Sequence, residues 1–502
     1  MLPGRSGWAG LCALALLASG CLSSSGPTAV SPNAALPKLP VVPGAPIVQD
    51  HDHADMSLHL DRFAMEPVAL ATGYDGPTPA GVFYTEEDFK DGWAYVCRGG
   101  GQPGIGPLGA SLGGFVIVNV SDPRNPLPVG QQEGVPCSDI KVNDANDLVF
   151  YATQRNAWYD IVANPAAPQE KLPRGVYLVN VADKAHPSVE RFMPIPLNGV
   201  HTINYVNTGS RELLLVQTYD WMPDSGLVAG FPVPFPSTGQ VNPALQRSQI
   251  FEVTRAADGK RDLQLLSVFS MHDVAPQGVN YFPHDVTVQK HPITGDWLAY
   301  YAYWDLGMVI VNINDPANPK LVSVFDDTTP SAYVHLHQAR PFPHLIDGKH
   351  ITVTEPELPS AAESGQFTIV DTTDPAHPVK LGYWTLPGNL VIPGGFLFSP
   401  HNFNLANGRI YAANYHAGIW VVDVGSPEHL AHPEAVGFFQ ADHRNRAAED
   451  CGIADSFWSA FYVDGYVYGT DGCAGLTILQ FQGDKGLEGK GPRVVMETVG
   501  QE

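Results

Sequence analysis

The chain has 502 residues, of which 44% are hydrophobic and only 16% are charged. Its 50 Gly and 45 Pro argue against a helical bundle or a coiled coil, and its 9 Trp, 19 Tyr and 22 Phe argue against disorder. The net charge of -23 argues against a nucleic-acid partner, because binding to phosphates needs clustered Lys and Arg. We therefore expect a folded protein of short strands and turns.

Residues 1–20 are predicted to be a signal peptide. Arg5 precedes an apolar stretch from Trp8 to Ala18 that is too short to span a membrane as a mature helix. The run Leu-Ala-Ser-Gly-Cys that ends at Cys21 resembles the lipobox of bacterial lipoproteins. This resemblance implies cleavage before Cys21, lipidation of that residue and attachment to the bacterial cell envelope, with Leu22 implying the outer membrane. The alternative is an ordinary secretory signal with a chance cysteine.

Residues 21–65 are predicted to be a lipidated Cys followed by a tether. The segment from residue 22 to about 48 carries three consecutive serines and six prolines, a composition that has no core of its own. His51 and His53 could bind a metal, but their place at the end of a tether favours an incidental pair. No later stretch is long and apolar enough to span a membrane.

Residues 80–500 are predicted to form one domain of repeated strands. A segment of β-branched and aromatic residues recurs along the chain, usually ended by an Asp-Pro or Pro turn, as in the run from Gly307 to Pro319. Other copies begin at Gly114, Gly175, Gln366 and Gly418, and weaker ones begin at Gln249 and Gly475. A further apolar run follows several copies, such as Leu321–Phe325.

A hairpin turn is predicted before each copy. Gly, Asn or Asp occurs there, and these residues favour the positive φ angles of such turns. These turns lie at Asp91-Gly92, Asn146-Asp147, Thr208-Gly209, Thr294-Gly295, Asp347-Gly348, Asn407-Gly408 and Asp464-Gly465. One unit is therefore strand, turn, strand, loop, strand, turn and strand. Its radial repetition predicts an all-β fold, a β-propeller of about seven four-stranded antiparallel blades. A flat sandwich or two barrels are the alternatives.

The Val-Ile-Val-Asn/Asp run followed by Asp-Pro-x-x-Pro resembles the LVIVD-repeat family of bacterial surface proteins. The resemblance covers about residues 80 to 482 and is weaker in the third and seventh units, and the loops here are longer than the family's. It implies a cell-surface location and no defined reaction.

Four cysteines remain after the predicted signal peptide and lipidated Cys21, and an even number in an exported protein suggests disulfides. The repeat register places all four at one rim of the propeller. We predict the pairs Cys97–Cys137 and Cys451–Cys473, which would fasten the first and last blades. Free thiols with a metal or redox role are the alternative.

A histidine opens the innermost strand in four units when the units are aligned on their hairpin turns. These are His201, His284, His337 and His401, and unit two has Cys137 and unit seven Trp458 at this position. Innermost strands line the axial channel of a propeller, so these imidazoles could hold a divalent transition metal or another ligand. Alternatively, each histidine caps its own blade through hydrogen bonds to the backbone.

Loops that follow the second strands share this rim, and they carry acidic and aromatic residues. The candidates are Asp220, Trp304, Asp305, Tyr415 and His416, together with the run Glu355-Pro356-Glu357. We expect these loops and the histidines to form an axial funnel.

Two functions remain open, because propellers host both binding proteins and enzymes. The first is a lipid-anchored platform that binds an envelope protein, a glycan or another ligand at the funnel. The second is a metal-dependent enzyme that uses the histidines, with Asp285, Asp305 or Asp220 as acid or base. Sequence signatures of serine hydrolases, nucleotide-binding enzymes and HExxH zinc enzymes do not occur in the chain.

Overall fold

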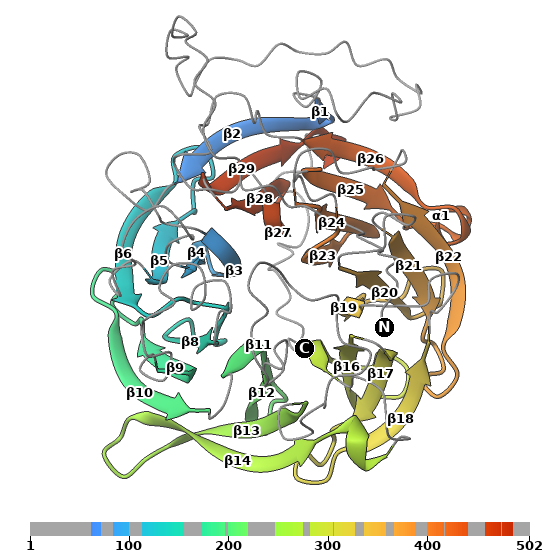
Figure 1. Cartoon of the computed structure of the whole chain (residues 1–502). Coiled ribbons are helices and arrows are strands. Elements are labelled where there is room, and N and C mark those ends of the chain that lie inside the picture. Colours follow the sequence, from blue (N-terminus) through green and yellow to red (C-terminus); the bar gives the residue numbers. More distant parts are fainter. Residues whose placement is uncertain are drawn as a thin grey trace, which may run out of the picture.

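The computed structural model describes residues 62–71, 84–99, 113–154, 173–195, 199–218, 246–274, 282–304, 306–326, 336–357, 366–386, 399–415, 417–439, 457–472 and 474–484. These residues form seven antiparallel sheets arranged radially around one axis (Figure 1). The predicted seven-bladed β-propeller is confirmed. Among the described helices, none is long and apolar enough to cross a membrane.

The blades follow one another in chain order, and each contributes its first strand to the axis (Figure 1). Blade 1 contains β3 (Tyr84–Lys90), β4 (Trp93–Gly99), β5 (Gly113–Asn119) and β6 (Leu127–Gly134). Blade 2 contains β7 (Asp139–Val142), β8 (Leu148–Thr153), β9 (Gly175–Asn180) and β10 (Ser188–Pro194). Blade 3 contains β11 (Val200–Asn207), β12 (Glu212–Thr218), β13 (Ser248–Arg255) and β14 (Arg261–Phe269), followed by the 3-10 helix η4 (Met271–Asp273).

The second half of the ring repeats this pattern. Blade 4 contains β15 (Pro283–Lys290), β16 (Trp297–Tyr303), β17 (Gly307–Asn312) and β18 (Lys320–Phe325). Blade 5 contains β19 (Leu336–Pro341), β20 (Ile351–Pro356), β21 (Gln366–Asp371) and β22 (Val379–Thr385). Blade 6 contains β23 (Phe403–Ala406), β24 (Arg409–Ala413), β25 (Ile419–Asp423) and β26 (Glu434–Phe439), with the short helix α1 (Pro427–Ala431) before β26. Blade 7 contains β27 (Phe457–Val463), β28 (Tyr466–Asp471) and β29 (Gly475–Phe481), followed by η6 (Gln482–Asp484).

The recurring apolar segment is the third strand of each blade, where both faces are covered. In β17, Met308 to Val311 are fully buried, whereas Leu321 and Val324 of the outermost strand β18 are 38% and 39% exposed. Side chains of adjacent blades pack against each other. For example, Val206 of blade 3 and Val286 of blade 4 belong to the same core cluster. The apolar core therefore lies between the blades, and the first strand of each blade lines the axis.

The predicted hairpin turns adopt the backbone that their residues favour. Asp91, Asn146, Asp347, Asn407 and Asp464 have φ between 49° and 53°, and four of them are followed by a glycine that also has positive φ. Gly307, which opens β17, has φ of +96°, and a Cβ there would lie 2.3 Å from the carbonyl oxygen of Phe325. Only glycine therefore fits at the start of β17, which lies against the end of β18.

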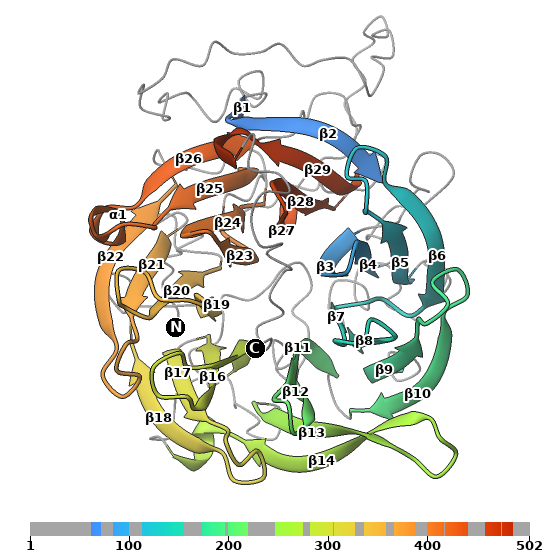
Figure 2. The same ribbon diagram turned by 180° about the vertical axis from the view of Figure 1, so that it is seen from behind.

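The ring begins earlier than the predicted boundary at residue 80. β2 (Met65–Ala71) pairs with β29 as the fourth strand of blade 7, and β1 (Arg62–Phe63) pairs with β26 at the edge of blade 6. Ala64 lies between these strands with φ of 52°. The N-terminal strands therefore join the last two blades along the outer edge of the ring (Figure 2). They were not predicted because they lack the repeat pattern.

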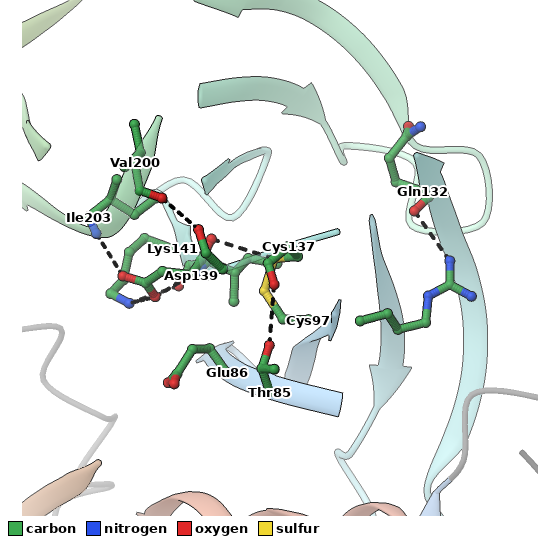
Figure 3. Close-up of a disulfide and its surroundings, with 12 residues drawn as sticks. Thr85, Glu86, Cys97, Gln132, Cys137, Asp139, Lys141, Val200 and Ile203 are labelled. Atoms are coloured by element: carbon green, nitrogen blue, oxygen red, sulfur yellow. Dashed lines mark hydrogen bonds and ion pairs between the residues drawn. A yellow bond between two sulfur atoms is a disulfide. The ribbon is translucent and has the colours of Figure 1, made fainter. Parts of the chain in front are cut away.

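A disulfide joins Cys97 of β4 to Cys137, which precedes β7, so it links blades 1 and 2 (Figure 3). This predicted pair is confirmed, whereas Cys451 and Cys473 lie outside the described residues. Polar side chains also join neighbouring blades near the axis. Asp139 Oδ2 accepts a hydrogen bond of 2.7 Å from the backbone N–H of Ile203 in blade 3 (Figure 3).

Candidate functional site

The four predicted histidines lie side by side around the axis, one from each of blades 3 to 6. The Nε2 atoms of His201 and His284 are 2.8 Å apart. The ring centroids of His284 and His337 are 4.3 Å apart, and those of His337 and His401 are 4.4 Å apart. The structure thus brings together the residues that the repeat register singled out.

β-Bulges position three of these side chains. In β11, β15 and β19 the pairing register shifts at His201, His284 and His337, respectively, so that each histidine lies at the irregularity of its hairpin. An extra residue in one strand loses its ladder partner and is turned out of the sheet. Similar shifts occur in β3 at Glu86 and in β27 at Trp458. A bulge in the innermost strand therefore directs a side chain toward the axis in blades 1, 3, 4, 5 and 7.

Oxygen acceptors fix the Nδ1 side of three of the imidazoles. His201 Nδ1 is 2.6 Å from Gln154 Oε1, His337 Nδ1 is 2.7 Å from Glu355 Oε1, and His401 Nδ1 is 2.5 Å from the carbonyl oxygen of Trp458. An oxygen acceptor at Nδ1 favours the tautomer that carries its proton there. The lone pair of each of these rings therefore lies on Nε2, and that of His201 faces the Nε2 atom of His284.

Burial lowers the pKa of all four imidazoles, to about 3 in His201 and about 4 in His401. Charging any one of them would also repel the neighbouring rings. All four side chains are consequently neutral at neutral pH, which is the form that binds a metal ion.

A carboxylate from blade 5 completes the cluster. Glu357 Oε2 is 3.9 Å from His284 Nε2, and its Oε1 accepts a hydrogen bond of 2.5 Å from the Tyr415 hydroxyl. Burial raises the pKa of Glu357 to about 7. Tyr415 has φ of +45°, a backbone strain that is uncommon for an aromatic residue and is typical of functional sites. We refer to the four histidines, Glu355, Glu357 and Tyr415 as the axial cluster.

Aromatic rings surround the axial cluster. Trp304 stacks on His284 with ring centroids 4.9 Å apart, and Trp458 lies 4.9 Å from the ring of His401. Tyr415 contacts His401 at 4.8 Å. Trp304 and Tyr415 are thus placed where the funnel was expected. Asp220, Asp305 and His416, which were predicted for the same rim, lie outside the described residues.

Charged side chains of the innermost strands lie close to the axial cluster, and most of them were not predicted from the sequence. They include Glu86, Asp139 and Lys141, which Figure 3 shows near the disulfide, together with Asp285 and Arg340. Burial, reinforced by Asp139, raises the pKa of Glu86 well above its usual value, and burial raises that of Asp285 to about 6. Glu86 lies with Thr85 in the bulge of blade 1, one residue after the position that corresponds to His201. Extending the register to the first unit could have pointed to this segment.

The sheets and their arrangement define a β-propeller. Residues 293–327, which include β16, β17 and β18, match the model of the LVIVD repeat. The chain is thus a seven-bladed β-propeller in which one segment matches the LVIVD repeat. None of the curated proteins matches it.

Solved structures that resemble the chain are propellers with little sequence similarity. The β-propeller domain of Cps50 (Swd1) from Myceliophteria thermophila is 8% identical, with 83% of this chain and 99% of that chain covered and a TM-score of 0.49. Sqt1 from Saccharomyces cerevisiae is also 8% identical, with 79% and 82% covered and a TM-score of 0.46. These low scores carry no information on function.

Proposed function

We propose that this protein is a ligand-binding β-propeller of the bacterial cell envelope and that the axial cluster is its binding site. The observation that carries the proposal is the meeting of four neutral imidazoles from four consecutive blades. A propeller is commonly a rigid scaffold for interactions, and its axial mouth is where loops from all blades converge.

Two other histidines of this chain show what a purely structural role looks like. His291 Nε2 is 3.0 Å from the carbonyl oxygen of Thr372, and His350 Nε2 is 3.2 Å from that of Phe342. Both residues are fully buried, and their imidazoles bond to the backbone. In the axial cluster, His401 also bonds to a backbone carbonyl, through Nδ1, but the Nε2 atoms of His201 and His284 face each other. This arrangement favours a ligand over the capping alternative.

Attachment to the envelope is part of the proposal. The lipobox-like run supports acylation of Cys21, and the following segment supports a tether that leads to the ring. β1 and β2 lie at the circumference of the ring, so the tether would connect to the propeller at its outer edge and not at the innermost strands (Figure 2). Membrane fractionation with palmitate labelling tests the anchor. The native chain should partition with membranes, and Cys21→Ser should not, whereas a membrane-bound, palmitate-labelled Cys21→Ser would contradict the anchor.

A thermal-shift screen with the full chain tests the binding site. The panel would contain transition-metal ions, cell-wall saccharides and small organic acids, each added singly. We expect at least one class to raise the melting temperature, and Trp304→Ala and His337→Gln should abolish that rise. Tyr383→Ala, on the exposed outer strand β22, is the matched control because Tyr383 is 57% exposed and far from the axis. A rise that persists in both axial variants would contradict the proposed site.

A metal-dependent enzyme is the second candidate. The observation that favours it is Glu357, a carboxylate with pKa near 7 beside an imidazole and a tyrosine hydroxyl, because a general base works best when its pKa is near the operating pH. Turnover of ester or phosphoester substrates that requires both an added metal and Glu357 would support catalysis. Activity that Glu357→Gln leaves unchanged would oppose it.

A further inference from the structure

We propose that the axial cluster binds one divalent transition-metal ion of the kind that prefers imidazole, such as Zn²⁺ or Cu²⁺, through His284, His337 and Glu357. The inference rests on the proposed function, since it names the ligand of that site. Each of these three residues offers one ligand atom, and the three atoms all lie within 4.8 Å of one another. The ring of His201 contacts that of His284, and the ring of His401 contacts that of His337. His201 and His401 are therefore the candidates for further ligands.

The contact between His201 and His284 holds two imidazole nitrogens at a spacing that a metal ion could bridge. The Nδ1 of His201 faces an oxygen acceptor, so its Nε2 presents a lone pair to the Nε2 of His284 at 2.8 Å. His284 Nδ1 has no hydrogen-bond partner among the described residues, so a neutral His284 can carry its proton on Nε2 and donate it to this lone pair. Ligand nitrogens at 2.0–2.1 Å from one ion, at neighbouring coordination positions, are about 3 Å apart, so a metal ion can replace the proton with little movement.

Hydrogen bonds around the cluster match those of a metal site. Histidine ligands usually donate their second N–H group to a carboxylate or a backbone carbonyl, which orients the ring and raises its basicity. His337 does so to Glu355, and His401 does so to the backbone of Trp458. Glu357 is oriented in turn by the hydroxyl of Tyr415. These supporting contacts are thus formed for His337, His401 and Glu357, whereas Nδ1 of His284 has no hydrogen-bond partner among the described residues.

The charge balance near the axis also favours a cation. Seven carboxyl groups lie on the innermost strands and in the axial cluster, against four basic side chains. The carboxyl groups are those of Glu86, Glu87, Asp88, Asp139, Asp285, Glu355 and Glu357, and the basic residues are Lys90, Lys141, Lys290 and Arg340. Because opposite charges interact more strongly at low dielectric, a divalent ion would stabilise the charged form of carboxylates in this interior. The imidazole ligands select a transition metal over Mg²⁺ or Ca²⁺, which prefer oxygen ligands.

Metal analysis of the full chain tests this inference. The chelated and desalted protein would be loaded separately with Zn²⁺, Cu²⁺, Co²⁺ or Mg²⁺, and the retained ion would be counted per chain. We expect one transition-metal ion per chain and no retained Mg²⁺. With Cu²⁺, electron paramagnetic resonance should show hyperfine coupling to nitrogen. His284→Ala and His337→Ala should each lose the ion and this coupling.

Two further variants separate a ligand from a residue that merely supports the fold. Glu357→Gln keeps the size of the side chain and should weaken metal binding while the circular dichroism spectrum stays unchanged. Glu355→Gln, a positioning residue, should raise the metal Kd about 10–100-fold and leave the stoichiometry at one. His377→Ala is the matched control, because His377 lies on an exposed turn of blade 5 and bonds only to Asp374 among the described residues.

Three results would overturn the inference. They are a native chain that retains no ion, an ion that every axial variant retains, and an ion that is lost on replacing His51 and His53 of the tether instead. A native chain without metal that still binds a saccharide or an organic acid at the axial residues would refute the metal site and leave the proposed function standing. If no member of the panel binds, both proposals fail.

Discussion

The disulfide between blades 1 and 2 allows a quantitative prediction. Cys97 and Cys137 are separated by 40 residues, and both are buried, at 0% and 3% exposure. A cross-link restricts the unfolded chain, and for a loop of this length the lost entropy is about 13 cal/mol/K. Removing the bond should therefore lower the free energy of unfolding by about 4 kcal/mol at 25 °C.

The single variants Cys97→Ala and Cys137→Ala and the double variant test this account together. Each variant breaks the same bond, so all three should lose nearly the same free energy in guanidinium unfolding followed by tryptophan fluorescence. The losses should not add, because the second substitution has no cross-link left to remove. A loss below about 1 kcal/mol in the double variant, or a double loss equal to the sum of the single ones, would refute the reasoning.

Three further predictions concern the axis and the repeat. Asp139→Ala removes the hydrogen bond to the backbone of Ile203 and should cost about 2 kcal/mol in urea unfolding, whereas an unchanged midpoint would show that the blades do not depend on it. Burial lowers the pKa of His401 to about 4 in the folded state, so its contribution to stability is complete above pH 6.5 and falls as the pH is lowered below that value. Between pH 7 and pH 5, metal-free His401→Asn should therefore lose about 2 kcal/mol less free energy of unfolding than the metal-free native chain. Equal losses in the two proteins would contradict this. Gly307→Ala should cost at least about 2 kcal/mol in the same assay because its Cβ would collide with a backbone oxygen, and a neutral result would mean that the strand can shift.

Much of the fold could be predicted because the repeat leaves a local signature in every blade. The pairs Asp91-Gly92, Asp347-Gly348 and Asn407-Gly408 mark hairpins whose positive φ angles the structure contains. The spacing of these turns then gives the number of blades, and the same register placed the four histidines around one axis. The repeat register also predicted the disulfide between Cys97 and Cys137, which the structure contains.

The remaining features depend on contacts between segments that are distant in the sequence. The strand Met65–Ala71 carries no repeat pattern, and only its pairing with β29 shows that it completes blade 7. Glu355 and Glu357 were among several loop carboxylates, and the loop sequence alone does not show that they reach His337 and His284. The bulges that turn these side chains toward the axis arise from strand pairing.

Anomalous X-ray scattering from crystals of the metal-loaded full chain tests the central claim most directly. Data recorded above and below the absorption edge of the bound metal locate that ion independently of any variant. The account predicts one anomalous peak per chain within coordination distance, about 2 Å, of nitrogen atoms of His284 and His337 and of a carboxylate oxygen of Glu357. No peak on the propeller axis, or a peak held by other residues, would contradict it.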